Sequence, residues 1–175
     1  AFEAPPRPDP SSQAFRSWFQ GSKVVDTKGE PLVVFHGSRS LIEVFDPKVT
    51  KDGGLHFGTE AQASMRAAGL QKALTPVYLK AENLQRSRDT GGNWAGKIAS
   101  AKAAGKDGIV YLNRYEGIQT ETVMKASREG VDLDRLTDAQ FRRYVPEAKD
   151  SYIVFEPTQI KSAVSNSGAF DPKNP

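Results

Sequence analysis

The chain has 175 residues, 38% of them hydrophobic and 26% charged, so its length fits one domain with a real core better than two. It has no cysteine, which excludes disulfides and thiolate metal sites, and its net charge is only +3. No apolar run approaches the roughly 20 residues that span a bilayer and no signal peptide is visible, so we expect no membrane partner.

Prolines crowd the start of the chain, with four of them in residues 1–10. Such a segment is typical of an extended linker, so we expect a linker over 1–10 and a single domain over 11–175. The first residue is Ala1 rather than Met, which suggests a piece of a longer protein or a processed one. A genuine mature N-terminus is the alternative.

Short helices and strands alternate through the first half of that domain. The Ser11–Ser12 pair can cap a helix and Gly21 can end it. Apolar runs on both sides of the turn at 26–29 indicate a hairpin. The expected elements are a helix from the serine cap to Phe19, strands over 24–25 and 32–35, a helix over 60–70 and a strand over 76–79.

The second half continues with a helix over 94–104 and a strand over 108–112, and the last clear strand covers 152–155. Residues 118–149 carry six acidic and six basic side chains, which suggests an insertion with a short helix over 138–144. Because short strands outnumber helices and lie close in sequence, we predict an α+β fold with a split, mainly antiparallel sheet and short flanking helices.

The chain has only two histidines, and each lies in a setting that suits ligand binding. His36 ends an apolar run and precedes Gly37, so a strand could hold the imidazole while the glycine lets a ligand approach the backbone. A neutral imidazole can bond a ribose hydroxyl, and the N–H and C=O of Gly37 match a carboxamide. A core histidine at a strand end is the alternative interpretation.

The second histidine, His56, is followed by Phe57 and preceded closely by two glycines. An aromatic ring at this place could stack on a flat heteroaromatic ring, and simple packing in a glycine-rich turn is the alternative. Two imidazoles without a His-x-x-x-His spacing do not suggest a metal site, so we expect none.

A basic stretch runs from Lys80 to Lys106, where six basic residues minus two acidic ones give a net charge of +4. Such a stretch can meet a dinucleotide pyrophosphate or a nucleic acid. A solvated helix face is the alternative interpretation.

Taken in chain order, these fragments resemble the ADP-ribosyltransferase superfamily of the His-Tyr-Glu type, which includes diphtheria-type toxins and poly(ADP-ribose) polymerases. Phe35–Ser38 resembles its Tyr-His-Gly-Thr element, Gly54–Thr59 its Gly-Ile-Tyr-Phe-Ala element, and Ser151–Phe155 the strand that begins Glu-Tyr-Ile-Val-Tyr. The resemblance spans roughly residues 13–172. Within the superfamily, the chain most resembles the ART-PolyVal-like transferases of phage and polymorphic-toxin proteins.

This resemblance implies an enzyme that grips NAD as co-substrate and breaks its nicotinamide–ribose bond without a metal. Its NAD contacts fall at His36, Gly37, Ser38, His56, Phe57 and Gly58. The chain departs from the family pattern in three places. The stacking tyrosine falls at His56, a second tyrosine near Ala67 is absent, and the catalytic glutamate falls at Ser151.

Cleavage of the nicotinamide–ribose bond passes through an oxocarbenium-like ribose, which a carboxylate can stabilise. Glu116 is the preferred carrier, because the two strands that flank the insertion should pair antiparallel and bring it beside Ser151. Glu121 ranks second, and Asp150 should point to the opposite face of its strand. His36 and Glu116 are therefore the predicted catalytic residues.

We accordingly expect a mono-ADP-ribosyltransferase that modifies a protein or a nucleic acid. The resemblance implies a toxin, effector or phage-encoded modifier that acts in the cytoplasm. Secretion or a phage particle could deliver it there. An immunity protein is then a partner, and a monomer is the default state. One alternative is an NAD glycohydrolase. The other is a non-catalytic module that binds nucleic acid or protein, and Ser151, His56 and the basic stretch favour this second alternative.

Overall fold

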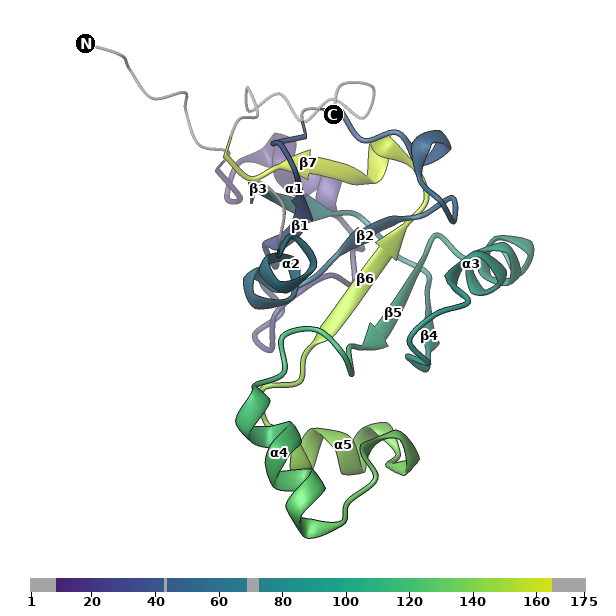
Figure 1. Cartoon of the computed structure of the whole chain (residues 1–175). Helices are drawn as coiled ribbons and strands as arrows, with labels where there is room; N and C mark the ends of the chain where they lie inside the picture. The colour runs from purple at the N-terminus through teal and green to yellow at the C-terminus, as the bar shows by residue number, and fades with distance from the viewer. Residues whose placement is uncertain (1–8, 43, 69–72, 165–175) are drawn as a thin grey trace.

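Two β-sheets form the centre of the computed structural model, which describes residues 9–42, 44–68 and 73–164 (Figure 1). The first sheet has the strand order β1-β3-β7 and is antiparallel throughout. The second has the order β2-β6-β5-β4 and is antiparallel except for the pair β4–β5. The strands are β1 (Val34–Ser38), β2 (Leu55–Phe57), β3 (Ala73–Leu79), β4 (Leu84–Ser87), β5 (Gly108–Leu112), β6 (Asp150–Val154) and β7 (Ile160–Ser162).

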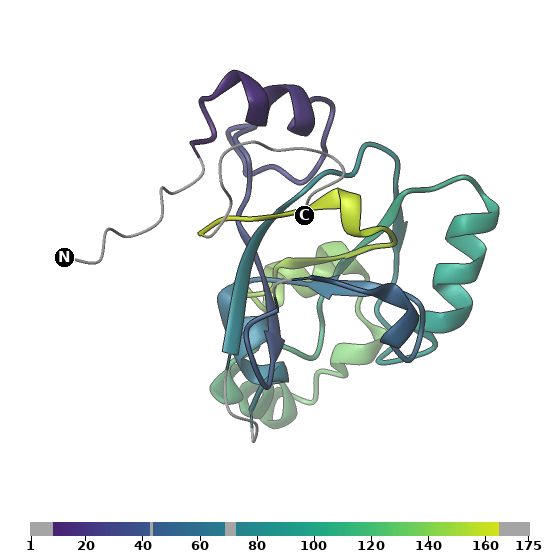
Figure 2. The ribbon, with the colours of Figure 1, turned by 90° about the horizontal axis from the view of Figure 1, so that it is seen from above.

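Short helices flank these sheets. Helix α2 packs on β1 and β3, and α3 packs on β5. Seen from above, α1 and α3 lie on different sides of the molecule (Figure 2). The predicted α+β fold with a split, mainly antiparallel sheet is confirmed. The α-helices of the described residues are α1 (Gln13–Phe19), α2 (Glu60–Arg66), α3 (Trp94–Ala103), α4 (Thr120–Glu129) and α5 (Asp138–Tyr144).

The core between the two sheets is apolar and draws on both of them. Val34 and Val77 of the first sheet belong to the same buried cluster as Phe57 and Val154 of the second. A further cluster around Ile98 packs α3 on the other face of the four-stranded sheet. Strands β5 and β6 are therefore covered on both faces and almost wholly buried.

Several predicted elements match the structure closely. Strand β5 and helix α5 have the predicted bounds, and Ser12 caps α1 as expected. Helix α2 ends at Arg66, short of its predicted end. Residues 69–72 lie outside the described ranges, as does most of the predicted linker at 1–10.

Other predictions are wrong in extent or missed an element. The predicted hairpin reduces to one bridge between Val25 and Pro31, because the chain before it bonds elsewhere: the N–H of Val24 donates to the Ser22 hydroxyl, and that of Lys23 to the Ala81 carbonyl oxygen. The apolar run instead enters β1, which pairs with β3. Strand β6 begins at Asp150, two residues before its predicted start. Strands β2, β4 and β7 and helix α4 had no counterpart among the predicted elements.

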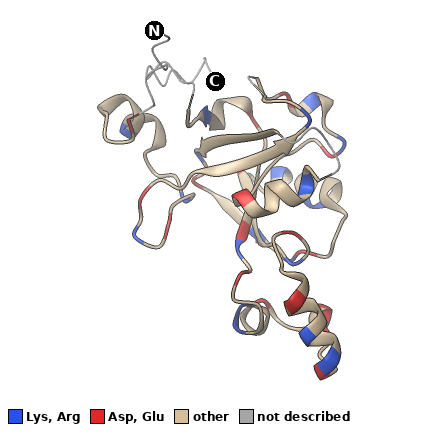
Figure 3. Ribbon diagram, turned by 60° about the vertical axis from the view of Figure 1, so that its left-hand side comes forward, with Lys and Arg blue, Asp and Glu red and all other residues tan. Residues whose placement is uncertain are grey.

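Residues 118–149 connect β5 to β6 and lie to one side of the sheets, at the bottom of Figure 1. They form α4, a 3-10 turn over Leu133–Arg135, and α5, and they contribute Phe141 and Val145 to an apolar cluster with Leu112. Charges of both signs are spread over this segment (Figure 3). That the segment is an insertion stays a prediction.

Asp150 ties β6 to β4 and α5. Its carboxylate accepts two hydrogen bonds from Arg86, at 2.9 and 2.8 Å, and one from Arg142 at 2.7 Å. Burial raises the pKa of Asp150, but the hydrogen bonds and charges of the two arginines outweigh it and hold the pKa below its usual 3.8. Ionised Asp150 therefore stabilises the fold above that pH, and this stabilisation is lost as the pH falls through the lowered pKa.

We expect Asp150→Asn to lower the free energy of unfolding at neutral pH by about 1 kcal/mol, because both arginines are about half exposed and solvent screens the pairs. Urea titrations over a pH series measure the effect, which should shrink as the pH falls below 3.8 and vanish below the lowered pKa of Asp150. A difference that stays constant with pH would contradict the ion-pair role. Asp26→Asn is the matched control, because Asp26 makes turn hydrogen bonds that asparagine can keep.

Candidate active site

The two sheets meet where β1 passes the end of β2. Phe35 and Gly58 exchange two backbone hydrogen bonds, of 2.8 and 3.0 Å. The His36 ring adds a third link, because its Nδ1 lies 2.7 Å from the carbonyl oxygen of His56. A carbonyl oxygen only accepts, so Nδ1 carries the proton and Nε2 is bare in the neutral ring. Burial lowers the pKa of His36, which favours that neutral ring.

A small hollow lies beside this junction, between α2 and the strands β2, β6 and β5. Its volume is about 10 Å3, which is room for about one water molecule. A Cβ on Gly37 would lie 2.1 Å from the carbonyl oxygen of Ala63, so only glycine lets β1 approach α2 this closely. The lining consists of Phe35, Gly37, His56, Phe57, Gly58, Gln62, Ala63, Arg66, Tyr111, Glu116 and Ser151.

Gly37 lines this hollow, and its backbone N–H and C=O lie on the open edge of β1, which is an edge strand. In an antiparallel strand the N–H and C=O of one residue point to the same edge, and those of the next residue point to the other. Phe35 uses the outer edge of β1 to bond Gly58, so Gly37 presents its own pair on that edge two residues later. Ser38 lies outside the lining, and its hydroxyl donates to the carbonyl oxygen of Ser40 at 2.6 Å.

The rings of His36, Phe45 and Phe57 contact one another, with centroids 5.3 to 5.7 Å apart. Phe45 and Phe57 belong to the core between the sheets, whereas His36 is half-buried and is not among the residues that line the hollow. Successive side chains of a strand point to opposite faces, so the ring of Phe57 lies on the other side of β2 from that of His56. A joint stacking role for both rings on one nicotinamide does not fit this geometry, although Phe57 is part of the lining.

His56 has an acidic partner. Its Nε2 lies 2.7 Å from Oδ2 of Asp52, and this hydrogen bond lowers the pKa of the Asp52 carboxyl. The imidazole meets Trp94 edge to face, with centroids 6.2 Å apart, and Trp94 packs on Tyr111 at 4.3 Å. Nδ1 of His56 is buried and has no hydrogen-bond partner among the described residues.

Ser151, where the superfamily has its glutamate, is buried in a hydrogen-bond network. Its hydroxyl donates to Oε1 of Gln62 at 2.8 Å and accepts from Nδ2 of Asn113 at 3.0 Å. The same Asn113 amide donates to Oε1 of Glu116 at 3.0 Å. The predicted closeness of Glu116 and Ser151 is therefore present, and it follows from the pairing of β5 with β6. The catalytic role of Glu116 stays a prediction.

The three candidate acids differ in their surroundings. Glu116 is 26% exposed, lines the hollow and faces Arg66, whose Nη1 is 4.0 Å from its Oε1. Asp150 points to the opposite face of β6, as predicted, where two arginines hold it. Glu121 is exposed in the first turn of α4. Of the three, Glu116 alone lines the hollow.

Residues at or near the hollow that escaped the sequence interpretation include Asp52, Gln62, Arg66, Trp94 and Asn113. Gln62 carried a signal, because a Thr-x-x-Gln capping box marks a helix start. Asn113 follows a strand and bonds the N–H groups two and three residues later, which is typical of a turn. Both signals indicate local structure rather than a site, and Arg66 and Trp94 carried none.

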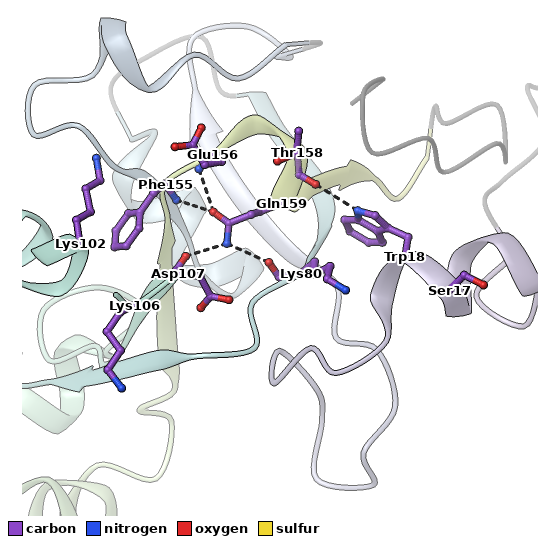
Figure 4. A pocket seen from close by; sticks show the side chains of 10 residues that line it. All are labelled: Ser17, Trp18, Lys80, Lys102, Lys106, Asp107, Phe155, Glu156, Thr158 and Gln159. Atoms are coloured by element: carbon purple, nitrogen blue, oxygen red, sulfur yellow. Dashed lines mark hydrogen bonds between the residues drawn. The ribbon is translucent and has the colours of Figure 1, made fainter. Parts of the chain in front are cut away.

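A larger cavity, of about 650 Å3, shares no lining residue with the hollow (Figure 4). Three lysines of the basic stretch gather there, and each ammonium already has an oxygen partner, at 2.9 Å for Lys80, 3.4 Å for Lys102 and 3.0 Å for Lys106. Lys102 also lies over the ring of Phe155, 5.2 Å from its centroid. Asp107 and Glu156 line the same cavity, so three lysines minus two carboxylates leave it a net charge of only +1.

Within the described ranges, no group of three or more His, Asp or Glu side chains is placed to hold a metal ion. His36 and His56 are joined through a backbone carbonyl rather than turned toward a shared point. No helix in the same part of the chain is long and apolar enough to cross a bilayer.

Comparison with known proteins bears on this arrangement. No curated protein matches the chain. A family model described as ADP-ribosyltransferase in polyvalent proteins matches residues 26–170, which include both histidine motifs, Glu116 and β6. This match covers well over half of the chain, and the α+β fold agrees with it. The chain therefore belongs to the ART-PolyVal family of ADP-ribosyltransferase domains.

Proposed function

We propose that the chain is an NAD-dependent mono-ADP-ribosyltransferase that works without a metal. Its family supports a transferase activity, and ADP-ribosyltransferase domains use NAD as their substrate. One observation supports the proposal for this chain in particular. Gly37, His56 and Glu116 are far apart in the sequence and lie in or after the strands that the superfamily uses, yet all three line one hollow.

The proposed reaction replaces the bond from the nicotinamide nitrogen to ribose C1′ with a bond from C1′ to an acceptor atom. Nicotinamide leaves as a neutral ring, and the ribose carries oxocarbenium-like charge in the transition state. The Glu116 carboxylate stabilises that charge and holds the ribose 2′-hydroxyl. The backbone of Gly37 holds the carboxamide, and the bare Nε2 of His36 accepts from a ribose hydroxyl.

A nicotinamide ring needs more room than the hollow has, so side chains must move when NAD binds. Arg66 is half exposed and makes one long ion pair with Glu116, so it can leave at little cost. Its departure would also free the Glu116 carboxylate for the ribose. The proposal therefore includes a side-chain opening step before chemistry.

We expect His36→Ala and Glu116→Ala each to lower NAD turnover by about 10²–10³-fold, because each removes a polar group that contacts the ribose. The assay measures nicotinamide release and follows label from NAD marked on its adenylate half into the protein and nucleic-acid fractions of a cell lysate. Glu121→Ala, which removes an exposed carboxylate on α4, is the matched control and should keep full turnover. Full turnover in a folded His36 or Glu116 variant would remove that residue from the mechanism.

NAD glycohydrolase is the near alternative, because hydrolysis shares the cleavage of the nicotinamide bond and the hollow has room for about one water molecule. Nicotinamide and free ADP-ribose, with no label retained in either fraction, would favour it. Label retained in one fraction would instead support transfer and identify the acceptor as protein or nucleic acid.

A non-catalytic module that binds nucleic acid is the second alternative. Ser151 stands where the superfamily has its glutamate, and three lysines gather at the cavity in Figure 4 beside the ring of Phe155. Lysines that neutralise phosphates release counterions, so binding of this kind weakens as salt rises.

If the chain binds single-stranded RNA through this cavity, changing Lys80, Lys102 and Lys106 together to Gln should reduce the slope of log affinity against log salt by about 2. Fluorescence anisotropy with a labelled oligonucleotide, repeated over a salt series, measures the slope. Lys28, Lys125 and Arg128, which lie outside this cavity, changed together to Gln are the matched control. An equal loss in both triple variants would mean that the cavity has no special part in binding.

The biological setting belongs to the same proposal. A modifying transferase of a polyvalent protein would act in the cytoplasm of a cell, as a toxin, effector or phage-borne modifier. An immunity protein would be a partner of such a toxin, and we propose a monomer as the default state.

A further inference from the structure

Chemistry fixes the direction of the hydrogen bond between Asp52 and His56. An ionised carboxylate can only accept, so the proton in this 2.7 Å contact lies on Nε2 of the imidazole. Nδ1 of the neutral ring is then a bare lone pair. It is buried and has no hydrogen-bond partner in the described part of the chain. A buried polar atom without a partner is uncommon in folded proteins, and a catalytic role is one of the known reasons for it.

The surroundings of His56 suit such a role. His56 is one of the residues that line the hollow, and its ring has Trp94 at its edge and Tyr111 beyond. Two charged groups, Arg66 and Glu116, line the same hollow, and they face each other 4.0 Å apart. Asp52, in contrast, bonds the His56 ring directly, with its Oδ2 2.7 Å from Nε2.

We propose that His56 is the general base that activates the acceptor, and that Asp52 is the positioning residue that holds its ring in the Nε2–H tautomer. This inference rests on the proposed transferase function and adds a role that the stacking interpretation of His56 lacks. Two different groups then do two different tasks. The Glu116 carboxylate stabilises the charge on the ribose, and the His56 imidazole removes the proton from the acceptor.

The step balances as follows. The acceptor X–H gives its proton to Nδ1 of His56 while the electron pair on X forms the new bond to ribose C1′. The bond from C1′ to the nicotinamide nitrogen breaks, and its electron pair returns to the ring, which leaves neutral. His56 is then an imidazolium held by the Asp52 carboxylate, and it gives its proton to solvent before the next turnover.

Asp52 also offers an exact chemical handle on the tautomer. Its Oδ1 accepts from the N–H of Gly54 at 3.0 Å, and its Oδ2 accepts from His56. In Asp52→Asn the carbonyl oxygen of the amide must stay on Gly54, because only an acceptor can bond that N–H. The amide NH2 then faces Nε2 and forces the proton of the ring onto Nδ1, which can no longer accept.

The test combines nitrogen-15 NMR of the histidine side chains with steady-state kinetics on the same samples. The chain has two histidines, so the wild-type spectrum should show one Nδ1–H ring, from His36, and one Nε2–H ring, from His56. Asp52→Asn should convert the second ring to Nδ1–H. It should also lower kcat for nicotinamide release by about 10²–10⁴-fold, with KM for NAD changed by less than about twofold.

Two further variants sharpen the result. Asp46→Asn, an exposed residue of the same loop that caps a 3-10 turn, is the matched control and should change neither the spectrum nor kcat. His56→Phe keeps a ring for stacking but has no base, so it should lower kcat and spare KM. A raised KM with kcat preserved would overturn the base role in favour of stacking.

The outcomes separate this inference from the function on which it rests. Wild-type turnover that Asp52→Asn leaves intact overturns the inference alone, whether or not the tautomer changes. Two Nδ1–H rings in the wild-type spectrum overturn it as well. A wild-type protein that releases no nicotinamide overturns the proposed function and this inference together, and the spectrum then still shows whether the Asp52–His56 pair exists.

Discussion

Two backbone hydrogen bonds between Phe35 and Gly58 join the two sheets at the place where the candidate site lies. They place the β1 motif beside the β2 motif, so that His36 can bond the backbone of His56. They also require a bare backbone at Gly58, where a Cβ would lie 2.3 Å from Oε1 of Gln62 and 3.1 Å from Oγ of Ser151. The glycines of both motifs are therefore needed for close packing before any ligand is considered.

Ser151 stands where the resemblance to the superfamily predicts the glutamate of β6, and two amide side chains hold its hydroxyl. Ser151 is bonded by Gln62 on one side and by Asn113 on the other. Asn113 then reaches Glu116, which places a carboxylate at the same hollow from the chain after β5 rather than from β6. Two neighbouring antiparallel strands can thus exchange the source of an acidic group, because their ends lie side by side.

Local chemistry explains which parts of the fold could be predicted from the sequence. Ser12 caps α1, and the apolar run of β5 has clear limits, so both elements were found. Helix α4 has no side-chain cap at Gln119, and β4 has the mixed sequence Leu-Gln-Arg-Ser, so neither carries a local signal. Strand β4 exists because it pairs with β5, which is a long-range fact.

The features of the candidate site also differ in how far the sequence predicts them. The histidine motifs and the closeness of Glu116 to Ser151 could be predicted, because one follows from a local pattern and the other from the pairing of two strands. The face on which each ring lies could not, since it depends on the register of β2 against β6. The bond from Asp52 to His56 escaped for a similar reason, because it depends on the path of the loop before β2.

The size of the hollow sets a condition on any ligand that enters it. Gln62 makes three hydrogen bonds there, with the Thr59 N–H, the Ser151 hydroxyl and the Lys149 carbonyl oxygen. At about 1 kcal/mol each, withdrawing Gln62 costs about 3 kcal/mol, which weakens Kd by about a hundredfold. Arg66 gives up only one long, half-exposed ion pair, which is worth about 0–1 kcal/mol. A ligand that enters past Arg66 therefore binds more tightly than one that must displace Gln62, and it meets Glu116 as it enters.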